Sequence, residues 1–387
     1  MYLACCFTFI PNTALLFPVG KLALVLSGGG ARGAFQAGAL MELLAWFDRN
    51  NKRINILSGT SVGALNGMSI AQASSLADAR AEIETQWKKL TNADVYKIRG
   101  RELFALFMKF ATTPMDRWSS VRGVDSLFDN TPLFRTYIDG YLQHDRIRRS
   151  ATVDEFLVSL CSLSTGEAYL KSITAEPDTQ RAQEYIMAST ITTVAYSPVR
   201  TTVPDPGLPP ELAAMPQLYA DGGISNKTPL KAILHAGDIS ELFVVNTYPS
   251  YPNKTEHSIT AEYPNVFSML MRTALELLPN LYFLRDMETV RDVNNDIRAW
   301  TALRERVLAT APDTATRETI DRAFQDAAAR LSFTQGNKHI IEPVVIAPDE
   351  ELPVQDTEFV QPKLGETFEM GRKKAKGILA QLGSRSG

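Results

Sequence analysis

Apolar positions in the first 250 residues alternate between short continuous runs and longer stretches with helical spacing. Residues 22–26 form such a run, and residues 54–57, 155–162 and 241–245 are further strand candidates. Short apolar runs bounded by glycine or polar clusters are typical of strands buried on both faces. Because helical stretches separate them, the pattern predicts a mostly parallel central sheet covered by helices, a three-layer α/β/α arrangement.

The pattern changes after about residue 250. Residues 264–299 and 313–331 have apolar side chains at helical spacing. Residues 343–362 predict an extended loop or an edge strand. A last helix is expected over residues 367–382, and it ends at Gly383. This part of the chain is therefore expected to be mainly helical.

We expect three segments in the chain. We expect residues 1–20 to be a leader or disordered segment. They are apolar, but they lack the basic start of a secretory signal, since no Lys or Arg precedes Lys21, and Pro11 interrupts the apolar run that a membrane span needs. A membrane anchor is the alternative interpretation of this segment. Residues 21–250 form the main α/β domain. Residues 251–387 form a mainly helical C-terminal extension that ends in an amphipathic basic helix.

Charge and cysteine content narrow the class of partner. The net charge is -3, so nothing attracts the whole chain to nucleic acid, and no nucleic-acid partner is expected. The three cysteines have neither metal-ligand nor disulfide spacing, so they predict neither a metal site nor a disulfide framework. A reducing compartment follows most simply. We expect a cytoplasmic or peripheral membrane location, with secretion and lipid anchoring left open.

A glycine-rich loop follows the first strand and opens a helix. Such a loop turns several backbone N–H groups toward one point at a helix N-terminus, which suits an anion such as the oxyanion of acyl transfer. Its spacing also fits dinucleotide-binding loops, but these need a carboxylate after the second strand, where this chain has small residues. The candidate oxyanion hole consists of Gly28, Gly29, Gly30 and Arg32, with Gly33 as a supporting glycine.

The second strand leads into a Gly-x-Ser-x-Gly turn that precedes another helix. This is the context of a nucleophile elbow, a sharp turn that projects a serine from the carboxyl edge of a sheet. Bulky side chains at the glycine positions would collide in such a turn. The turn predicts Ser61 as the nucleophile, supported by Gly59 and Gly63.

A serine nucleophile needs a base. A carboxylate followed by two glycines offers one, because the glycines allow close approach of the backbone. A Ser-Asp-His triad with His235 or His257 is the alternative and would indicate an α/β-hydrolase-type esterase. His235 ends a helical pattern and His257 lies in a polar loop, and neither setting is typical of a base. The candidate base and its supporting glycines are Asp221, Gly222 and Gly223.

Together the three motifs resemble the patatin-like phospholipase family, in the family's order and across residues 21–250. The resemblance implies a patatin-like three-layer α/β/α fold. It also implies a lipid acyl hydrolase of phospholipase A or lysophospholipase type, which cleaves carboxylic esters through a Ser61 acyl-enzyme with Asp221 as base and without a cofactor. A phospholipid or another lipid ester is the implied substrate. A non-catalytic lipid-binding protein on the same fold is the alternative, against which the intact motifs count.

One segment departs from the family pattern. Residues 187–199 lack a proline that the family has near the middle of this segment. We expect a reshaped wall of the cleft, with Ser61 and Asp221 left in place.

Three further segments bear on lipid contact. The apolar stretches 103–108 and 267–284 fit an acyl groove or a lid, although helices packed in the core are the simpler interpretation. The last helix has basic and apolar sides. It predicts either peripheral membrane contact or an ordinary helix that closes the domain. Its basic side carries Arg372, Lys373, Lys374 and Lys376.

Overall fold

The structure is a computed structural model. It describes residues 20–123, 126–192, 195–201, 208, 211, 215–225, 227–235, 239–249, 278–328 and 340–385. The leader, His257 and most of the 267–284 stretch lie outside these residues. Within them, eight strands form one sheet in the order β10-β9-β1-β2-β5-β8-β7, with β6 beside β5, and β3 pairs with β4.

The elements have the following bounds. The strands are β1 (Lys21–Leu26), β2 (Ile54–Gly59), β3 (Lys97–Ile98), β4 (Phe128–Asp129), β5 (Val153–Ser162), β6 (Ala168–Ser172), β7 (Val199–Arg200), β8 (Leu218–Asp221), β9 (Ile239–Val245) and β10 (Val344–Ile346). The α-helices are α1 (Gly33–Arg49), α2 (Val62–Gln72), α3 (Leu76–Lys89), α4 (Asn92–Val95), α5 (Gly100–Thr112), α6 (Thr131–Phe134), α7 (His144–Arg148), α8 (Thr179–Thr190), α10 (Leu230–His235), α12 (Leu278–Leu308), α13 (Thr314–Ala328) and α14 (Lys363–Arg385). Shorter helical turns are η1 (Gly30–Arg32), η2 (Met115–Ser120), η3 (Arg135–Asp139) and η4 (Gly222–Ile224).

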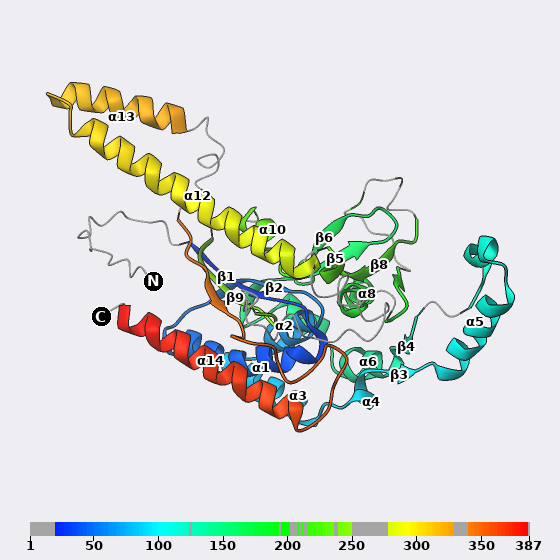
Figure 1. Ribbon diagram of the computed structural model, residues 1–387. Helices are drawn as coiled ribbons and strands as arrows, with labels where there is room; N and C mark the ends of the chain where they lie inside the picture. The colour runs from blue at the N-terminus through cyan, green and yellow to red at the C-terminus, as the bar shows by residue number, and fades with distance from the viewer. Residues whose placement is uncertain are drawn as a thin grey trace, which may run out of the picture.

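Strand β1 shows how the sheet separates two layers of helices. Leu22, Leu24 and Leu26 belong to a core cluster shared with α1, α2, α3, α8 and α14, whereas Ala23 and Val25 belong to a second cluster shared with α10 and α12. Successive side chains of a strand point to opposite faces, so a run of apolar residues is required when both faces are covered. Figure 1 shows α1 and α14 on one side of the sheet and α12 on the other. The predicted three-layer fold is confirmed.

The sheet is mostly parallel. Strand β1 pairs in parallel with β2 and β9, β9 with β10, and β2 with β5. Beyond β5 the direction changes, because β6 and β8 are antiparallel to β5 and β7 is antiparallel to β8. Strand β8 pairs with only the last three residues of β5, Leu160 to Ser162, so Asp221 at its end lies near the level at which β2 ends.

The C-terminal helix α14 is packed against α1, and the two backbones nearly touch. A Cβ atom added at Gly371 would lie 1.9 Å from the carbonyl oxygen of Phe35, and one added at Gly38 would lie 1.8 Å from that of Phe368. Phe368 and Ala375 are buried in the main core cluster. Strand β10 is the edge strand of the sheet. Residues 344–346 and 363–385 therefore complete the same domain as residues 21–250.

The basic side of α14 is partly occupied by ion pairs. Arg372 pairs with Glu42 at 2.8 Å and Lys374 pairs with Asp349 at 2.5 Å. The apolar side of the helix is buried against α1, which is the packing expected of a helix that closes the domain.

Helix α5 differs from the simpler interpretation of its sequence. None of its residues is buried, and Phe104 and Phe107 are 67% and 66% exposed. The helix projects from the body of the protein (Figure 1), so the interpretation of residues 103–108 as a core helix is wrong. No helix in the described part of the chain has both the length and the hydropathy needed to cross a bilayer.

Two glycines of α14 provide a matched test of this packing. We expect Gly371→Ala to destabilise the protein by about 1–3 kcal/mol, because its Cβ would overlap the α1 backbone. Gly377→Ala has open space around its Cβ and should stabilise the helix by ~0.5–1 kcal/mol. Chemical denaturation measures both. Equal effects of the two substitutions would contradict the close contact between the helices.

Candidate active site

Ser61 lies on a sharp turn between β2 and α2. Its backbone has φ 56 and ψ -124, a conformation that L-residues rarely adopt and that costs about 1–3 kcal/mol. Three hydrogen bonds hold the turn: Ser61 N donates to Ser189 Oγ (3.1 Å), the N–H of Gly63 donates to Thr60 O (2.8 Å), and that of Ala64 donates to Ser61 O (2.8 Å). Strain of this kind is typical of a nucleophile elbow.

The glycines of the elbow are required by close contacts, as the sequence predicted. A Cβ atom at Gly59 would lie 2.4 Å from Gly63 O, and one at Gly63 would lie 2.3 Å from Leu26 O. No side chain fits in either space.

Strand register explains why Asp221 reaches Ser61. In the β2–β5 pair, Gly59 lies opposite Val158, and in the β5–β8 pair, Leu160 lies opposite Asp221. Ser61 follows Gly59 by two residues, as Leu160 follows Val158. The serine and the aspartate therefore reach the same level at the carboxyl edge of the sheet.

The Asp221 carboxyl is buried and has a strongly shifted pKa. Only 4% of the residue is exposed, and burial raises the pKa from 3.8 to about 6. Four interactions oppose the shift: the backbone N–H of Gly223, the hydroxyl of Ser61, the charge of Lys227 and the hydroxyl of Thr192. Gly223 N donates to Oδ1 at 2.7 Å and Thr192 Oγ1 to Oδ2 at 3.3 Å. A carboxylate with this pKa is suited to accept a proton near neutral pH.

The glycine loop is held from both sides. The N–H of Gly28 donates to Lys227 O (3.2 Å), and the N–H of Ala31 donates to Asp356 O (2.8 Å). Between them, the N–H groups of Gly29 and Gly30 have no acceptor among the described residues, and both glycines line the cavity beside Ser61. Gly30 has φ 52, and a Cβ there would lie 2.0 Å from Asp356 O, so only glycine fits.

The Arg32 side chain forms ion pairs away from the cavity, not in the position expected for an oxyanion ligand. Its side chain is 1% exposed, and it pairs with Asp356 (Nε–Oδ1, 2.8 Å) and Glu351 (NH1–Oε2, 3.0 Å). The guanidinium lies 4.6 Å from the centre of the Tyr248 ring. Arg32 is not among the residues that line the cavity. Its contacts attach the glycine loop to the C-terminal segment.

Lys227 and Tyr248 complete this charged cluster. Lys227 Nζ donates to Tyr248 OH (2.6 Å), which donates to Asp356 Oδ2 (2.6 Å), and Lys227 Nζ lies 3.6 Å from the same carboxylate. Lys227 thus forms an ion pair with Asp356, and its positive charge lowers the pKa of Asp221. The cluster connects Asp221, the glycine loop and Asp356.

A chain of buried hydrogen bonds connects three helices to the strand ends beside the glycine loop. Trp87 Nε1 donates to Asn66 Oδ1 (2.9 Å), Asn66 Nδ2 donates to Gln36 Oε1 (2.9 Å), and Gln36 Nε2 donates to the carbonyl oxygens of Ser27 (3.1 Å) and Val245 (3.3 Å). These bonds connect α3, α2 and α1 to the ends of β1 and β9. A satisfied buried network of this kind fixes the position of the loop.

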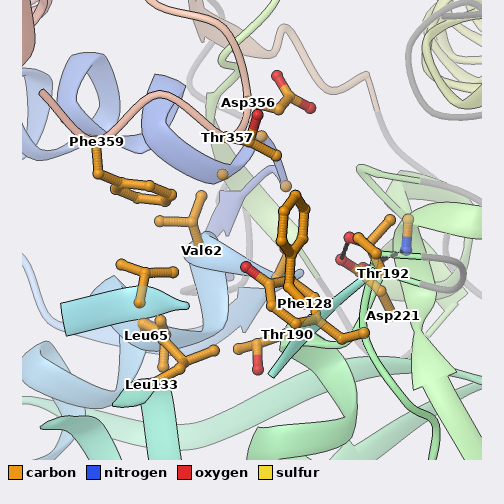
Figure 2. A pocket seen from close by; sticks show the side chains of 18 of the residues that line it. Val62, Leu65, Phe128, Leu133, Thr190, Thr192, Asp221, Asp356, Thr357 and Phe359 are labelled. Atoms are coloured by element: carbon orange, nitrogen blue, oxygen red, sulfur yellow. Dashed lines mark hydrogen bonds between the residues drawn. The ribbon is translucent and has the colours of Figure 1, made fainter. Parts of the chain in front are cut away.

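A cavity of about 460 Å³ opens beside Ser61. Asp221 and Thr192 lie on one side of Phe128 in the view of Figure 2, and a group of apolar side chains lies on the other. This group comprises Val62, Leu65, Leu133 and Phe359. Thr190, Thr192, Ala195 and Tyr196 also line the cavity, so the segment without the expected proline forms part of its wall. An apolar cavity with a few polar groups is typical of a site for a small, mostly apolar ligand.

The structure places the histidines as follows. His144 is buried and bonded to Thr179 Oγ1 (3.0 Å) and Ile173 O (3.3 Å). His235 ends α10. Among the described residues that line the cavity there is no histidine. The described part of the chain also contains no group of three or more His, Cys, Asp or Glu suited to a metal ion.

Several residues of the site have no clear signal in the sequence. Thr192 follows a helix end, Lys227 lies four residues after the Asp-Gly-Gly motif, and Asp356 lies in a stretch predicted only as extended. Thr192 and Lys227 lie close in sequence to recognised motifs, and this proximity could have marked them as candidate site residues. Asp356 reaches the site only through tertiary packing.

A serine on a strained strand-to-helix turn, a buried carboxylate and a glycine loop above an apolar cavity are the features of a serine acyl hydrolase. The profile of a family described as patatin-like phospholipase matches residues 24–234. The chain belongs to the patatin-like phospholipase family, a family of lipid acyl hydrolases.

Comparisons with individual proteins add little to this assignment. None of the curated proteins compared with the chain matches it. The crystal structure of VipD from Legionella pneumophila is similar with a TM-score of 0.40 and 14% sequence identity, over 94% of this chain and 67% of VipD. The family assignment rests on the profile match.

The raised pKa of Asp221 predicts a gain in stability on substitution. Because the folded pKa of about 6 exceeds the ordinary 3.8, ionised Asp221 costs the folded state about 3 kcal/mol above pH 6, and nothing below pH 4. Asp221→Asn removes this cost. We expect the variant to exceed wild type in free energy of unfolding at pH 8 by up to ~3 kcal/mol, with the difference shrinking toward pH 4. Urea denaturation at both pH values measures this, and a less stable variant at pH 8 would contradict it.

The charged cluster offers a second matched pair. Asp356→Ala removes a partner of the buried Arg32 and Lys227, and we expect a loss of about 2–3 kcal/mol, moderated because Asp356 is 26% exposed. Glu351 is the other acidic partner of Arg32, and its side chain is 63% exposed. Glu351→Ala should therefore lower the free energy of unfolding by less than ~1 kcal/mol. The comparison is made by thermal denaturation. Similar losses for both variants would show that Asp356 has no special role.

Proposed function

We propose that the chain hydrolyses carboxylic esters of phospholipids, as a phospholipase A or lysophospholipase, through a Ser61 acyl-enzyme with Asp221 as base. The observation that carries the proposal is the position of Ser61 beside the buried Asp221 carboxyl, at an apolar cavity. The cavity volume of about 460 Å³ suits a fatty acyl chain.

In the acylation step, the Asp221 carboxylate accepts the proton of the Ser61 hydroxyl while Oγ attacks the ester carbonyl carbon. The negative charge that develops on the carbonyl oxygen is stabilised by the N–H groups of Gly29 and Gly30, together with the N-terminus of α2. The N–H of Gly28 is bonded to Lys227 O, so its role is to hold the loop. When the ester C–O bond breaks, Asp221 returns the proton to the leaving alkoxide.

In the deacylation step, water attacks the acyl carbon of Ser61 and Asp221 accepts a proton from the water. The bond to Oγ breaks, Asp221 returns the proton to Ser61, and the fatty acid leaves. Two observations support a direct Ser-Asp mechanism. The pKa of Asp221 is raised to about 6, and the described lining of the cavity contains no histidine.

Three variants test the proposal with a mixed-micelle phospholipid assay. Ser61→Ala and Asp221→Asn should each lower kcat/KM by ~1,000-fold or more. Ser69→Ala, a buried serine of α2 that does not line the cavity, should retain activity. In wild type, kcat/KM should rise with pH through about pH 6 as Asp221 ionises, and then level off.

Different results would support the alternatives. Full activity of Ser61→Ala would refute the acyl-enzyme. Full activity of Asp221→Asn together with inactive His235→Ala or His257→Ala would replace the dyad by a Ser-Asp-His triad. A non-catalytic lipid-binding protein would fail to react with a fluorophosphonate probe at Ser61.

A further inference from the structure

A projecting arm, residues 97–123, carries several of the exposed apolar side chains in the described part of the chain. Of the thirteen large hydrophobic side chains exposed there, five lie on the arm, with exposed fractions from 45% to 77%. They are Ile98, Phe104, Phe107, Met108 and Met115. Contiguous exposed apolar groups mark contact surfaces for a partner or a membrane, because water solvates them poorly.

The apolar stripe on α5 does not serve the packing of the arm itself. Phe104, Phe107 and Met108 have the spacing i, i+3, i+4, so they share one side of the helix. Leu106 lies on another side and packs back on Gly123, where an added Cβ would lie 2.4 Å from its Cδ1. The internal contact of the arm therefore uses a different side of α5 and leaves the stripe exposed.

The charge of the arm differs from that of the whole protein. Residues 97–123 contain six Lys or Arg and two Asp or Glu, a formal charge of +4, whereas the chain has -3. The basic residues are Lys97, Arg99, Arg101, Lys109, Arg117 and Arg122. An apolar stripe on a segment of net positive charge matches an anionic bilayer surface, where apolar groups enter the interface and cations meet the headgroups.

Both ends of the arm are attached to the wall of the active-site cavity. Val95 precedes the arm, Leu127 and Phe128 follow it, and all three line the cavity. Between them, β3 and β4 close the base of the arm, with Ile98 opposite Phe128. Figure 1 shows α5 projecting away from the sheet beyond β3 and β4.

We propose that the arm binds the surface of an anionic lipid bilayer and so brings the opening of the cavity to its lipid substrate. The stripe of α5 and Met115 enter the interface, and the basic residues contact the anionic headgroups. This membrane contact is separate from hydrolysis. The proposal concerns binding, so it can succeed or fail independently of the proposed esterase activity.

Vesicle flotation with the full chain carrying Ser61→Ala tests the proposal, because this background prevents lipid turnover. The vesicles are phosphatidylcholine alone or phosphatidylcholine with phosphatidylglycerol. The arm variant is Phe104→Ser with Phe107→Ser, and the matched control is Leu281→Ser with Leu303→Ser, exposed side chains of α12 (57% and 45%). We expect the parent and the control to bind the phosphatidylglycerol vesicles, and the arm variant to bind at least ~10-fold more weakly.

Three results would overturn the proposal. The first is equal binding of the arm variant and the parent. The second is equal binding of the parent to neutral and anionic vesicles. The third is a parent that sediments as a dimer which the arm substitutions dissociate, since the arm would then be an interface between two copies. The arm variant should unfold at the same temperature as the parent in thermal denaturation, and this shows that the variant is folded.

Discussion

One constraint governs the proposed site: the carboxyl of Asp221 is buried, yet the proposed mechanism requires it to ionise near neutral pH. Full burial without partners would leave it protonated, and full exposure would make it a weak base. In the structure, a few neighbouring groups give the Asp221 carboxyl an intermediate pKa of about 6. Gly223 and Thr192 donate hydrogen bonds to the two carboxyl oxygens, and Lys227 supplies a nearby positive charge. The antiparallel pairing of β8 with β5 then sets this carboxyl at the level of Ser61.

The position of Lys227 depends in turn on residues far away in the sequence. Its ammonium group contacts Tyr248 and Asp356, and the backbone of Asp356 holds Ala31 next to the glycine loop. Residues 355–357 and Phe359 also form part of the cavity wall. Asp221, the glycine loop and the cavity are thus parts of one packed unit that includes residues 355–357 and Phe359.

Much of this arrangement could be predicted from local sequence. A strand followed by a glycine turn and a helix has a recognisable pattern over a few residues, so Ser61 and the glycine loop could be located, and the Asp-Gly-Gly motif added Asp221. The packing of β10 and α14 on the main domain could not be predicted, because it depends on contacts between residues more than 300 positions apart, such as Phe35 and Gly371. The exposure of α5 also escaped prediction. Its apolar spacing is that of a core helix, and only the fold shows that none of the described residues buries it.

The dependence on residues 344–385 has a consequence for the order in which the chain is made. Ser61 and Asp221 leave the ribosome well before the edge strand β10, residue 356 and α14 exist. Until then α1 lacks the helix that covers it, and the glycine loop lacks the carbonyl oxygen that holds Ala31. The nascent chain therefore contains Ser61 and Asp221 before the residues that hold the glycine loop and cover α1 have been synthesised.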